Sequence, residues 1–123
     1  MELHVKTKIN PTESKEKLLN ACENLFPSMD FIEKDSELVA TGRDKNDLVE
    51  FKEHLKIQEI RETTRSFLLR HIDGETLPFQ LNKQAALMGK VNFVDFQVAL
   101  GAIIVTLQDE DLEGLVQWIT SEP

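Results

Sequence analysis

The spacing of apolar residues changes repeatedly along this chain of 123 residues. From residue 2 to residue 10 every second side chain is suited to a covered face, which predicts a strand through Leu3, Val5, Thr7 and Ile9. The spacing then becomes helical through Leu18, Leu19, Cys22, Leu25 and Phe26, with Thr12 as the expected N-cap and Pro27 after the helix. A chain that switches between these two periods mixes strands and helices.

The rest of the sequence continues the alternation. Residues 29–34 and 37–43 predict a hairpin, and helices are predicted from Asp44 onward and over residues 57–72. The stretch "DGETLP" at 73–78 interrupts the pattern, residues 98–107 predict a strand, and Asp109 is expected to cap a last helix. This order predicts one α+β domain over residues 1–123, and not a parallel sheet of repeated strand-helix units.

The charge of the chain argues against a general affinity for nucleic acids. The 22 acidic and 14 basic residues give a net charge of −8, whereas binders of phosphate backbones are usually basic or carry a basic patch. Only residues 57–93 relieve the acidity, because five basic residues there oppose four acidic ones.

No segment is apolar for long enough to cross a bilayer, and "MELHVKTK" at the start lacks the apolar core of a signal peptide. We therefore expect a cytoplasmic protein without a membrane partner. The single cysteine, Cys22, is expected to be buried and inert, since it lies on the apolar stripe of the first helix. The three histidines stand apart from one another, and we expect no enzyme activity, metal, cofactor or small-molecule substrate.

The segment "LNKQAALMGKVNF" at 81–93 has two interpretations. In the first, Asn82 caps a short helix over 83–88, Gly89 takes the left-handed conformation after it, and only Lys83, Gln84 and Lys90 need be exposed. In the second, the polar side chains of Asn82, Lys83 and Gln84 bind a partner. Residue chemistry favours the first interpretation and leaves the second open.

The same segment carries a resemblance to a known family. "RETTRSFLLR" at 61–70, "FQLNKQAALMGKVNF" at 79–93 and "ALGAIIV" at 99–105 are similar to segments of an archaeal-specific family catalogued as predicted RNA-binding or exosome-associated proteins. The family's domain resembles that of the ribosomal protein that binds 5S ribosomal RNA. Prolines are common around the glycine turn in related sequences, whereas this chain has Ala99-Leu100-Gly101-Ala102. The resemblance implies an antiparallel sheet with packed helices, an ancestry among RNA-binding folds, and no known catalytic activity or cofactor.

Two functional hypotheses follow. The first is RNA or ribonucleoprotein binding through a local polar surface made of Arg61, Arg65, Asn82, Lys83, Gln84 and Lys90. Arg61 and Arg65 lie one helical turn apart, so they share a face. Lys6 and Lys8 on the wet face of the first strand form a second patch, although two lysines on a strand are usually only a solvated face or protection for a sheet edge.

The second hypothesis is a protein-interaction module, most simply a homodimer, with weak or no direct RNA binding. Apolar residues occupy both faces of segment 98–107, which indicates that both faces are covered, either by helices of the same chain or by a second copy. The edge of the first strand could also pair across a two-fold axis. We place this hypothesis first, and RNA binding in RNA processing or ribonucleoprotein assembly is its alternative.

Overall fold

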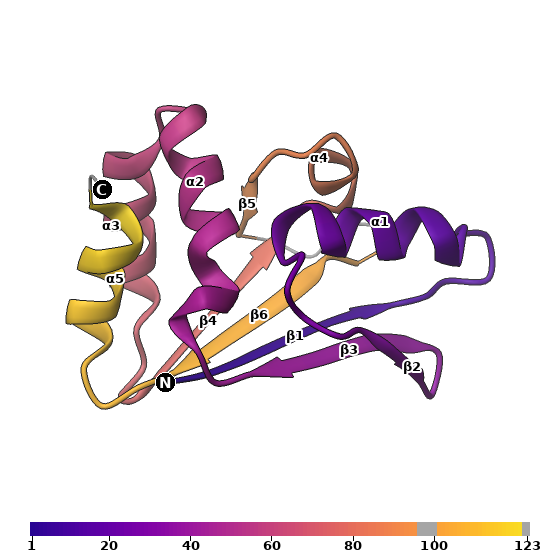
Figure 1. Ribbon diagram of the computed structural model, residues 1–123, viewed down its shortest axis with the longest axis horizontal. Helices are drawn as coiled ribbons and strands as arrows, with labels where there is room; N and C mark the ends of the chain where they lie inside the picture. Colours follow the sequence, from indigo (N-terminus) through magenta and orange to yellow (C-terminus); the bar gives the residue numbers. More distant parts are fainter. Residues whose placement is uncertain (96–100, 122–123) are drawn as a thin grey trace.

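The computed structural model describes residues 1–95 and 101–121 and confirms the predicted α+β class. In chain order its elements are β1 (Glu2–Lys8), α1 (Lys15–Leu25), β2 (Ile32–Lys34), β3 (Glu37–Gly42), the 3-10 helix η1 (Lys45–Leu48), α2 (Val49–Ile57), α3 (Arg61–His71), β4 (Thr76–Leu81), α4 (Lys83–Leu87), β5 (Phe93–Val94), β6 (Ile103–Gln108) and α5 (Leu112–Thr120). Figure 1 shows their arrangement.

The six strands form one antiparallel sheet in the order β2-β3-β1-β6-β4-β5. β1 lies inside this sheet, where Val5 pairs with Ala40 of β3 on one side and with Val105 of β6 on the other. Both edges of β1 are therefore occupied within the chain. The expectation that this edge pairs with a second copy is wrong.

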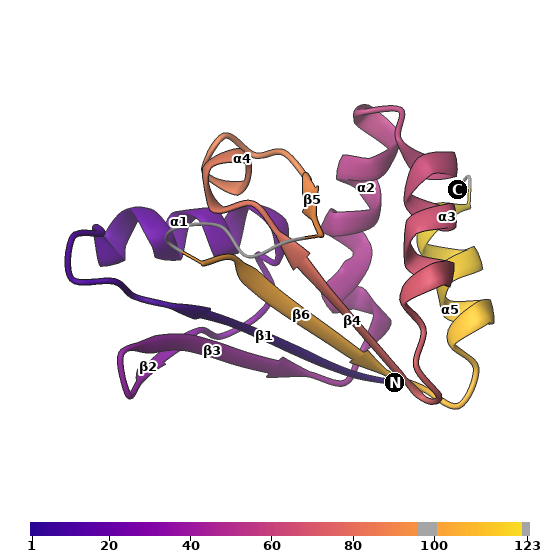
Figure 2. The ribbon, with the colours of Figure 1, turned by 180° about the vertical axis from the view of Figure 1, so that it is seen from behind.

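The helices cover one face of the sheet. In the views of Figures 1 and 2 the helices lie on the same side, with α1 and α4 over one end, α3 and α5 packed together at the other, and α2 between them. The strand residues that face the helices are almost fully buried, among them Leu3, Val5, Leu77, Val105 and Leu107. The core thus lies between this face and the helices.

Four phenylalanines fill the core under α2. Phe51 of α2 stacks on Phe26 with a centroid separation of 5.7 Å and contacts Phe79 and Phe93 through tilted or edge-on rings. The thiol of Cys22 is fully buried, and this burial raises its pKa to about 12. The prediction of a buried cysteine in the first helix is confirmed.

Local sequence signals placed several elements correctly. The hairpin of β2 and β3 turns at Asp35 and Ser36, which both have positive φ (51° and 62°), as the favoured two-residue hairpin turn requires. The cap positions are shifted, because Ser14 rather than Thr12 caps α1, and Asp111 rather than Asp109 caps α5. Asp109 instead accepts a hydrogen bond from the backbone N–H of Asp111, the residue that caps α5.

Strand β4 is not among the predicted elements, because "DGETLP" indicates only a break in the helical pattern. The turn is confined to residues 73–75, and β4 pairs with β6 along its whole length, including Pro78 opposite Thr106. Among the described residues β5 pairs only with Gln80 and Leu81, so Pro78 lies where β4 has one neighbouring strand. A proline is tolerated there because it lacks only one donor of the hydrogen-bond ladder.

The two faces of β6 differ in burial. Ile103, Val105 and Leu107 are fully buried under the helices, whereas Ile104 on the opposite face is half-buried. The first part of the predicted strand, residues 98–100, lies outside the described residues. For the described part, the helices of the chain cover one apolar face.

Candidate functional site

The six predicted contact residues do not form one surface. Arg61 and Arg65 lie on α3, whereas Asn82, Lys83, Gln84 and Lys90 lie on and around α4. Figure 1 shows α3 beside α5, with α2 between it and the pair of α4 and α1. The predicted patch is thus divided into two groups with different surroundings.

Asn82 and Gly89 mark the two ends of α4, as the first interpretation of this segment predicts. The side-chain oxygen of Asn82 accepts a hydrogen bond of 2.9 Å from the backbone N–H of Ala85, and the backbone N–H of Asn82 donates to the carbonyl of Asn92. Gly89 has φ +74°, a conformation that glycine adopts without strain. Gln84 and Lys90 are exposed as expected.

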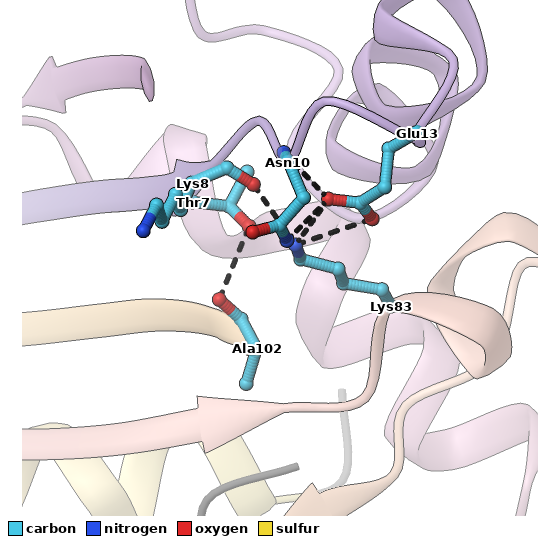
Figure 3. Close-up of polar contacts among 6 residues, drawn as sticks. All are labelled: Thr7, Lys8, Asn10, Glu13, Lys83 and Ala102. Carbon is cyan, nitrogen blue, oxygen red and sulfur yellow. Dashed lines mark hydrogen bonds and ion pairs between the residues drawn. The ribbon is translucent and has the colours of Figure 1, made fainter. Parts of the chain in front are cut away.

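Lys83 is buried, so its expected exposure is wrong. Its ammonium group donates to the carbonyl oxygen of Lys8 at 2.9 Å and to Oε1 of Glu13 at 3.0 Å (Figure 3). Only 9% of the Lys83 side chain and 14% of the Glu13 side chain are exposed. The ion pair therefore joins the end of β1, the start of α1 and the start of α4.

Glu13 accepts hydrogen bonds from Asn10 as well as from Lys83. Asn10 donates to Oε1 from its backbone N–H at 3.0 Å and from its side-chain amide at 2.7 Å. Burial alone would raise the pKa of the Glu13 carboxyl, but these hydrogen bonds and the charge of Lys83 together lower the pKa below its ordinary value. Glu13 was missed as a site residue, although a polar residue followed three positions later by Glu is a familiar local pattern before helices.

A shallow cleft of about 200 Å³ opens above this ion pair. Its lining combines the first turns of α1 and α4: Thr12, Glu13, Ser14, Lys17, Leu18, Ala21, Lys83, Gln84 and Leu87. Because Glu13 neutralises Lys83 at the inner end, the cleft offers no concentrated positive charge to a phosphate group. We interpret the Lys83–Glu13 ion pair and its hydrogen bonds as a structural contact that holds β1, α1 and α4 together, and we call it the joint of the fold.

Arg65 contacts the C-terminal end of α5. Its guanidinium donates to the hydroxyl of Thr120 at 2.9 Å and to the carbonyl of Thr120 at 3.1 Å. Lys52 of α2 reaches the same helix end and donates to the carbonyl of Ser121 at 2.9 Å. Cations are favourable there because the last carbonyls of a helix lack intrahelical donors.

Arg61 lies close enough to influence Lys52. Burial and then the positive charge of Arg61 lower the pKa of the Lys52 ammonium. Lys52 was missed by the sequence analysis, because nothing in the spacing of α2 indicates that its side chain meets a helix 66 residues later. The basic residues of this region hold α5 against α2 and α3.

The face of the sheet opposite the helices has a different composition. We call it the open face, because among the described residues no helix packs on it. One row crosses all six strands, since directly paired residues point to the same side: Ile32, Val39, Lys6, Ile104, Gln80 and Val94. Neighbouring rows add Thr41, His4, Thr106 and Pro78, then Lys34, Glu37 and Lys8, and finally Glu2, Gln108 and Thr76.

The charged residues of the open face are more often basic than acidic. Its three lysines outnumber its two glutamates, on a chain whose net charge is −8. Lys6 and Lys8 are exposed and stand on an inner strand, so protection of a sheet edge does not explain them. Edge protection is therefore excluded for these two lysines, and they belong to a solvated face that is accessible to a ligand.

Other kinds of site find little support in the described residues. Within residues 1–95 and 101–121, no group of three or more His, Cys, Asp or Glu side chains is arranged to hold a metal ion. None of the helices in these two ranges has both the length and the apolar character needed to span a membrane.

Comparison with known proteins places the chain in a family. The model of a sequence family described as RNA binding matches residues 2–108. A UPF0201 protein of Methanothermobacter thermautotrophicus is 34% identical over 122 residues, covering 98% of this chain and 92% of the relative. A UPF0201 protein of Sulfurisphaera tokodaii is also 34% identical over 122 residues, with coverage of 94% and 84%.

Solved structures agree with this assignment. The crystal structure of a UPF0201 protein from Methanococcus jannaschii has a TM-score of 0.84 and 33% identity, and the match covers 98% of this chain and 100% of that one. Another UPF0201 crystal structure has a TM-score of 0.87 and 32% identity, with coverage of 99% and 94%. The resemblance to an archaeal family is confirmed: the chain belongs to the UPF0201 proteins, and its sequence matches the family described as RNA binding.

Proposed function

We propose that the protein is a non-enzymatic RNA-binding module that contacts single-stranded RNA with the open face of its sheet. The observation that carries this proposal is the position of Lys6 and Lys8, which are exposed on an inner strand where they protect no edge. The family model described as RNA binding includes both residues. This assignment replaces the patch around Arg61, Arg65 and Lys83, because the charges of Arg65 and Lys83 are engaged with other parts of the chain.

The side chains of the open face suit a ribose-phosphate backbone better than a stack of bases. Lys6, Lys8 and Lys34 can each neutralise a phosphate. The hydroxyl groups of Thr41 and Thr106 and the amide group of Gln80 can form hydrogen bonds to phosphate or ribose oxygens. The rows hold no Phe, Tyr or Trp, so stacking contributes little there. Affinity for RNA of arbitrary sequence should be weak at near-physiological salt.

Salt dependence gives the first test. Fluorescence anisotropy of a labelled single-stranded RNA should show binding at low salt, and log K should fall with log salt concentration with a slope of about −2 for three neutralised phosphates. Binding that is absent at low salt, or that does not change with salt, would overturn the proposal.

A matched pair of charge reversals locates the surface. Lys6→Glu and Lys56→Glu change the net charge equally, but Lys56 is an exposed residue of α2 on the helical side of the molecule. We expect Lys6→Glu to abolish RNA binding, while Lys56→Glu weakens it only slightly through the overall field. Equal losses for the two variants would mean that the open face is not the binding surface.

A second candidate function is self-association through the same face, as the dimer hypothesis holds. It is favoured by the apolar members of the long row: Ile32, whose exposed fraction is 59%, and the half-buried Val39, Ile104 and Val94. Sedimentation equilibrium of the wild type and of Ile32→Lys tests it. A dimer that Ile32→Lys converts to monomer, with weaker RNA binding at high protein concentration, would favour this function over RNA binding.

A further inference from the structure

A second cleft, of about 380 Å³, lies between α3 and the edge strand β5. It is lined by Gln58, Ile60, Thr63, Thr64, Phe67, Val91, Asn92, Phe93 and Asp95. Its size falls within the range of pockets that hold small organic molecules, and its combination of aromatic rings with a few polar groups is typical of them. Of its lining residues, Phe93 belongs also to the aromatic core under α2, and the carbonyl of Asn92 accepts the hydrogen bond from Asn82.

The walls of the cleft are fixed by hydrogen bonds. The side-chain amide of Gln58 accepts from the backbone N–H of Val91 at 2.7 Å and donates to its carbonyl at 3.0 Å. The next residue, Glu59, has φ +57°, which is uncommon for a residue other than glycine. This pair of bonds ties the corner between α2 and α3 to the segment before β5, so the cleft is preformed.

Aromatic rings form the inner part of the cleft. Phe67 and Phe93 lie with their centroids 4.7 Å apart, and His71 stacks on Phe67 at 4.1 Å. Phe67 is almost fully buried, whereas Phe93 is half-buried. Phe93 therefore offers part of a π surface to a planar ligand.

The polar groups at the rim favour a neutral ligand that donates hydrogen bonds. Asp95 is 66% exposed, and its Oδ1 lies 3.4 Å from Nε2 of His71. Its second oxygen has no partner among the described residues and can accept from an amino group. A carboxylate at the rim repels a phosphate, so the backbone of an RNA strand must remain outside the cleft.

The cleft also adjoins the open face. Phe93 and Val94 are consecutive residues of β5, and successive side chains of a strand point to opposite sides of the sheet. Val94 belongs to the long row of the open face, while Phe93 lines the cleft. A strand of RNA on the open face thus reaches the cleft by turning around one edge strand.

We propose that the cleft between α3 and β5 takes one unpaired RNA base, preferentially a base that carries an amino group. This inference rests on the proposed function, because the open face supplies the contacts to the RNA backbone. Phe93 stacks on the base, and Asp95 accepts a hydrogen bond from its amino group. The cleft thereby adds base preference to a surface that otherwise reads only the backbone.

Free nucleosides test the cleft without the open face. Cytidine and uridine are of similar size. Cytidine has an amino group at C4 and an acceptor at N3, whereas uridine has a carbonyl oxygen at C4 and an N–H at N3, so the comparison tests whether Asp95 selects the exocyclic amino group. In a titration followed by backbone amide NMR signals, cytidine should shift the signals of Thr63, Thr64, Phe67 and residues 91–95. It should bind roughly tenfold more tightly than uridine, the ratio expected for one hydrogen bond to a charged acceptor. Equal affinities, or shifts confined to the open face, would overturn the inference.

Three variants identify the groups responsible. Asp95→Asn should remove the preference for cytidine, and Phe93→Leu should weaken the binding of both nucleosides while it retains an apolar side chain in the aromatic cluster. Asp73→Asn removes an exposed carboxylate from the turn after α3, outside the cleft, and should change neither. A preference for cytidine that survives Asp95→Asn contradicts the assignment, provided that the NMR spectrum shows a folded variant.

RNA oligomers separate this inference from the proposed function. Oligocytidine should bind more tightly than oligouridine of the same length, Asp95→Asn should equalise them, and Lys6→Glu should abolish both interactions. If RNA binds through Lys6 but the two oligomers bind equally before and after Asp95→Asn, the base site fails and the proposed function stands. If cytidine occupies the cleft but no RNA binds at low salt, the proposed function fails and RNA is excluded as the source of the base.

Discussion

Lys83 and Lys6 are both lysines in the same fold, yet they have opposite surroundings. Lys83 is buried against Glu13 and the carbonyl of Lys8, whereas Lys6 is exposed on the open face two residues before that carbonyl. The ammonium of Lys83 is saturated by its own chain, and that of Lys6 faces solvent. The buried ion pair of Lys83 and the proposed RNA surface therefore meet at the end of β1 without sharing a charge.

Removal of Lys83 should have the largest effect on stability. Lys83→Met leaves the buried carboxylate of Glu13 without its ion pair, and we expect a loss of about 3 kcal/mol in the free energy of unfolding. Urea denaturation followed by circular dichroism measures it, with Lys6→Met as the matched control. If Lys83→Met costs no more than Lys6→Met, the contrast between the two lysines disappears.

The second largest expected effect is a loss of folding stability at low pH. The pKa of Glu13 is lower in the folded protein than its ordinary value of 4.5, so the unfolded chain binds more protons as the pH falls through that range. The stabilisation by the ionised carboxylate is therefore complete above about pH 4.5 and is lost as the pH falls through the folded pKa. Melting temperatures of wild type and Glu13→Gln, measured from pH 7 to pH 3, should converge in acid. A constant difference between them would show that Glu13 does not titrate as stated.

Smaller losses are expected at the two ends of α4, which carries Lys83 to its partner. A Cβ at residue 89 would have no heavy atom within 4 Å apart from those of the adjoining residues, but Gly89→Val forces a β-branched residue into φ +74° and should cost about 1–2 kcal/mol. Asn82→Ala removes the cap and should cost about 1 kcal/mol. Thermal denaturation should rank the two in this order, and unchanged melting temperatures for both would contradict the assignment of the helix ends.

The smallest effect on stability is expected on the open face. Lys6→Ala and Lys8→Ala should each change the free energy of unfolding by less than about 0.5 kcal/mol, as exposed substitutions usually do. Chemical denaturation gives this value, and the same samples should show weaker RNA binding by anisotropy. A loss of several kcal/mol would place these lysines with Lys83 as parts of the joint.

The sequence predicts what depends on neighbouring residues and misses what depends on distant ones. The hairpin turn at Asp35-Ser36, the cap at Asn82, the corner at Gly89 and the buried Cys22 all follow from local pattern. Strand β4 was missed because a proline usually argues against a strand. Only the structure shows that Pro78 lies where β4 is paired on one side alone, a position at which a strand tolerates proline.

The candidate site was harder to predict for the same reason. Lys83 and Glu13 are separated by 70 residues, and Arg65 and Thr120 by 55, so no spacing rule connects them. Lys6 and Lys8 were noticed on the first strand, but only the strand order shows that this strand is internal. The sequence therefore indicates which residues of the middle region are polar, but it does not show which of them bond to other parts of the same chain.

The strand order also sets when the protein can fold. The centre of the sheet joins β1 to β6, with Val5 opposite Val105, so β1 has only β3 as a neighbour until β6 has left the ribosome. Contacts between segments so distant in sequence slow folding, because the entropy of closing the loop is lost before the contacts form. During synthesis the unpaired side of β1 is a strand edge that other chains can bind. Nascent chains that end before β6 should therefore depend on chaperones more than the finished protein does.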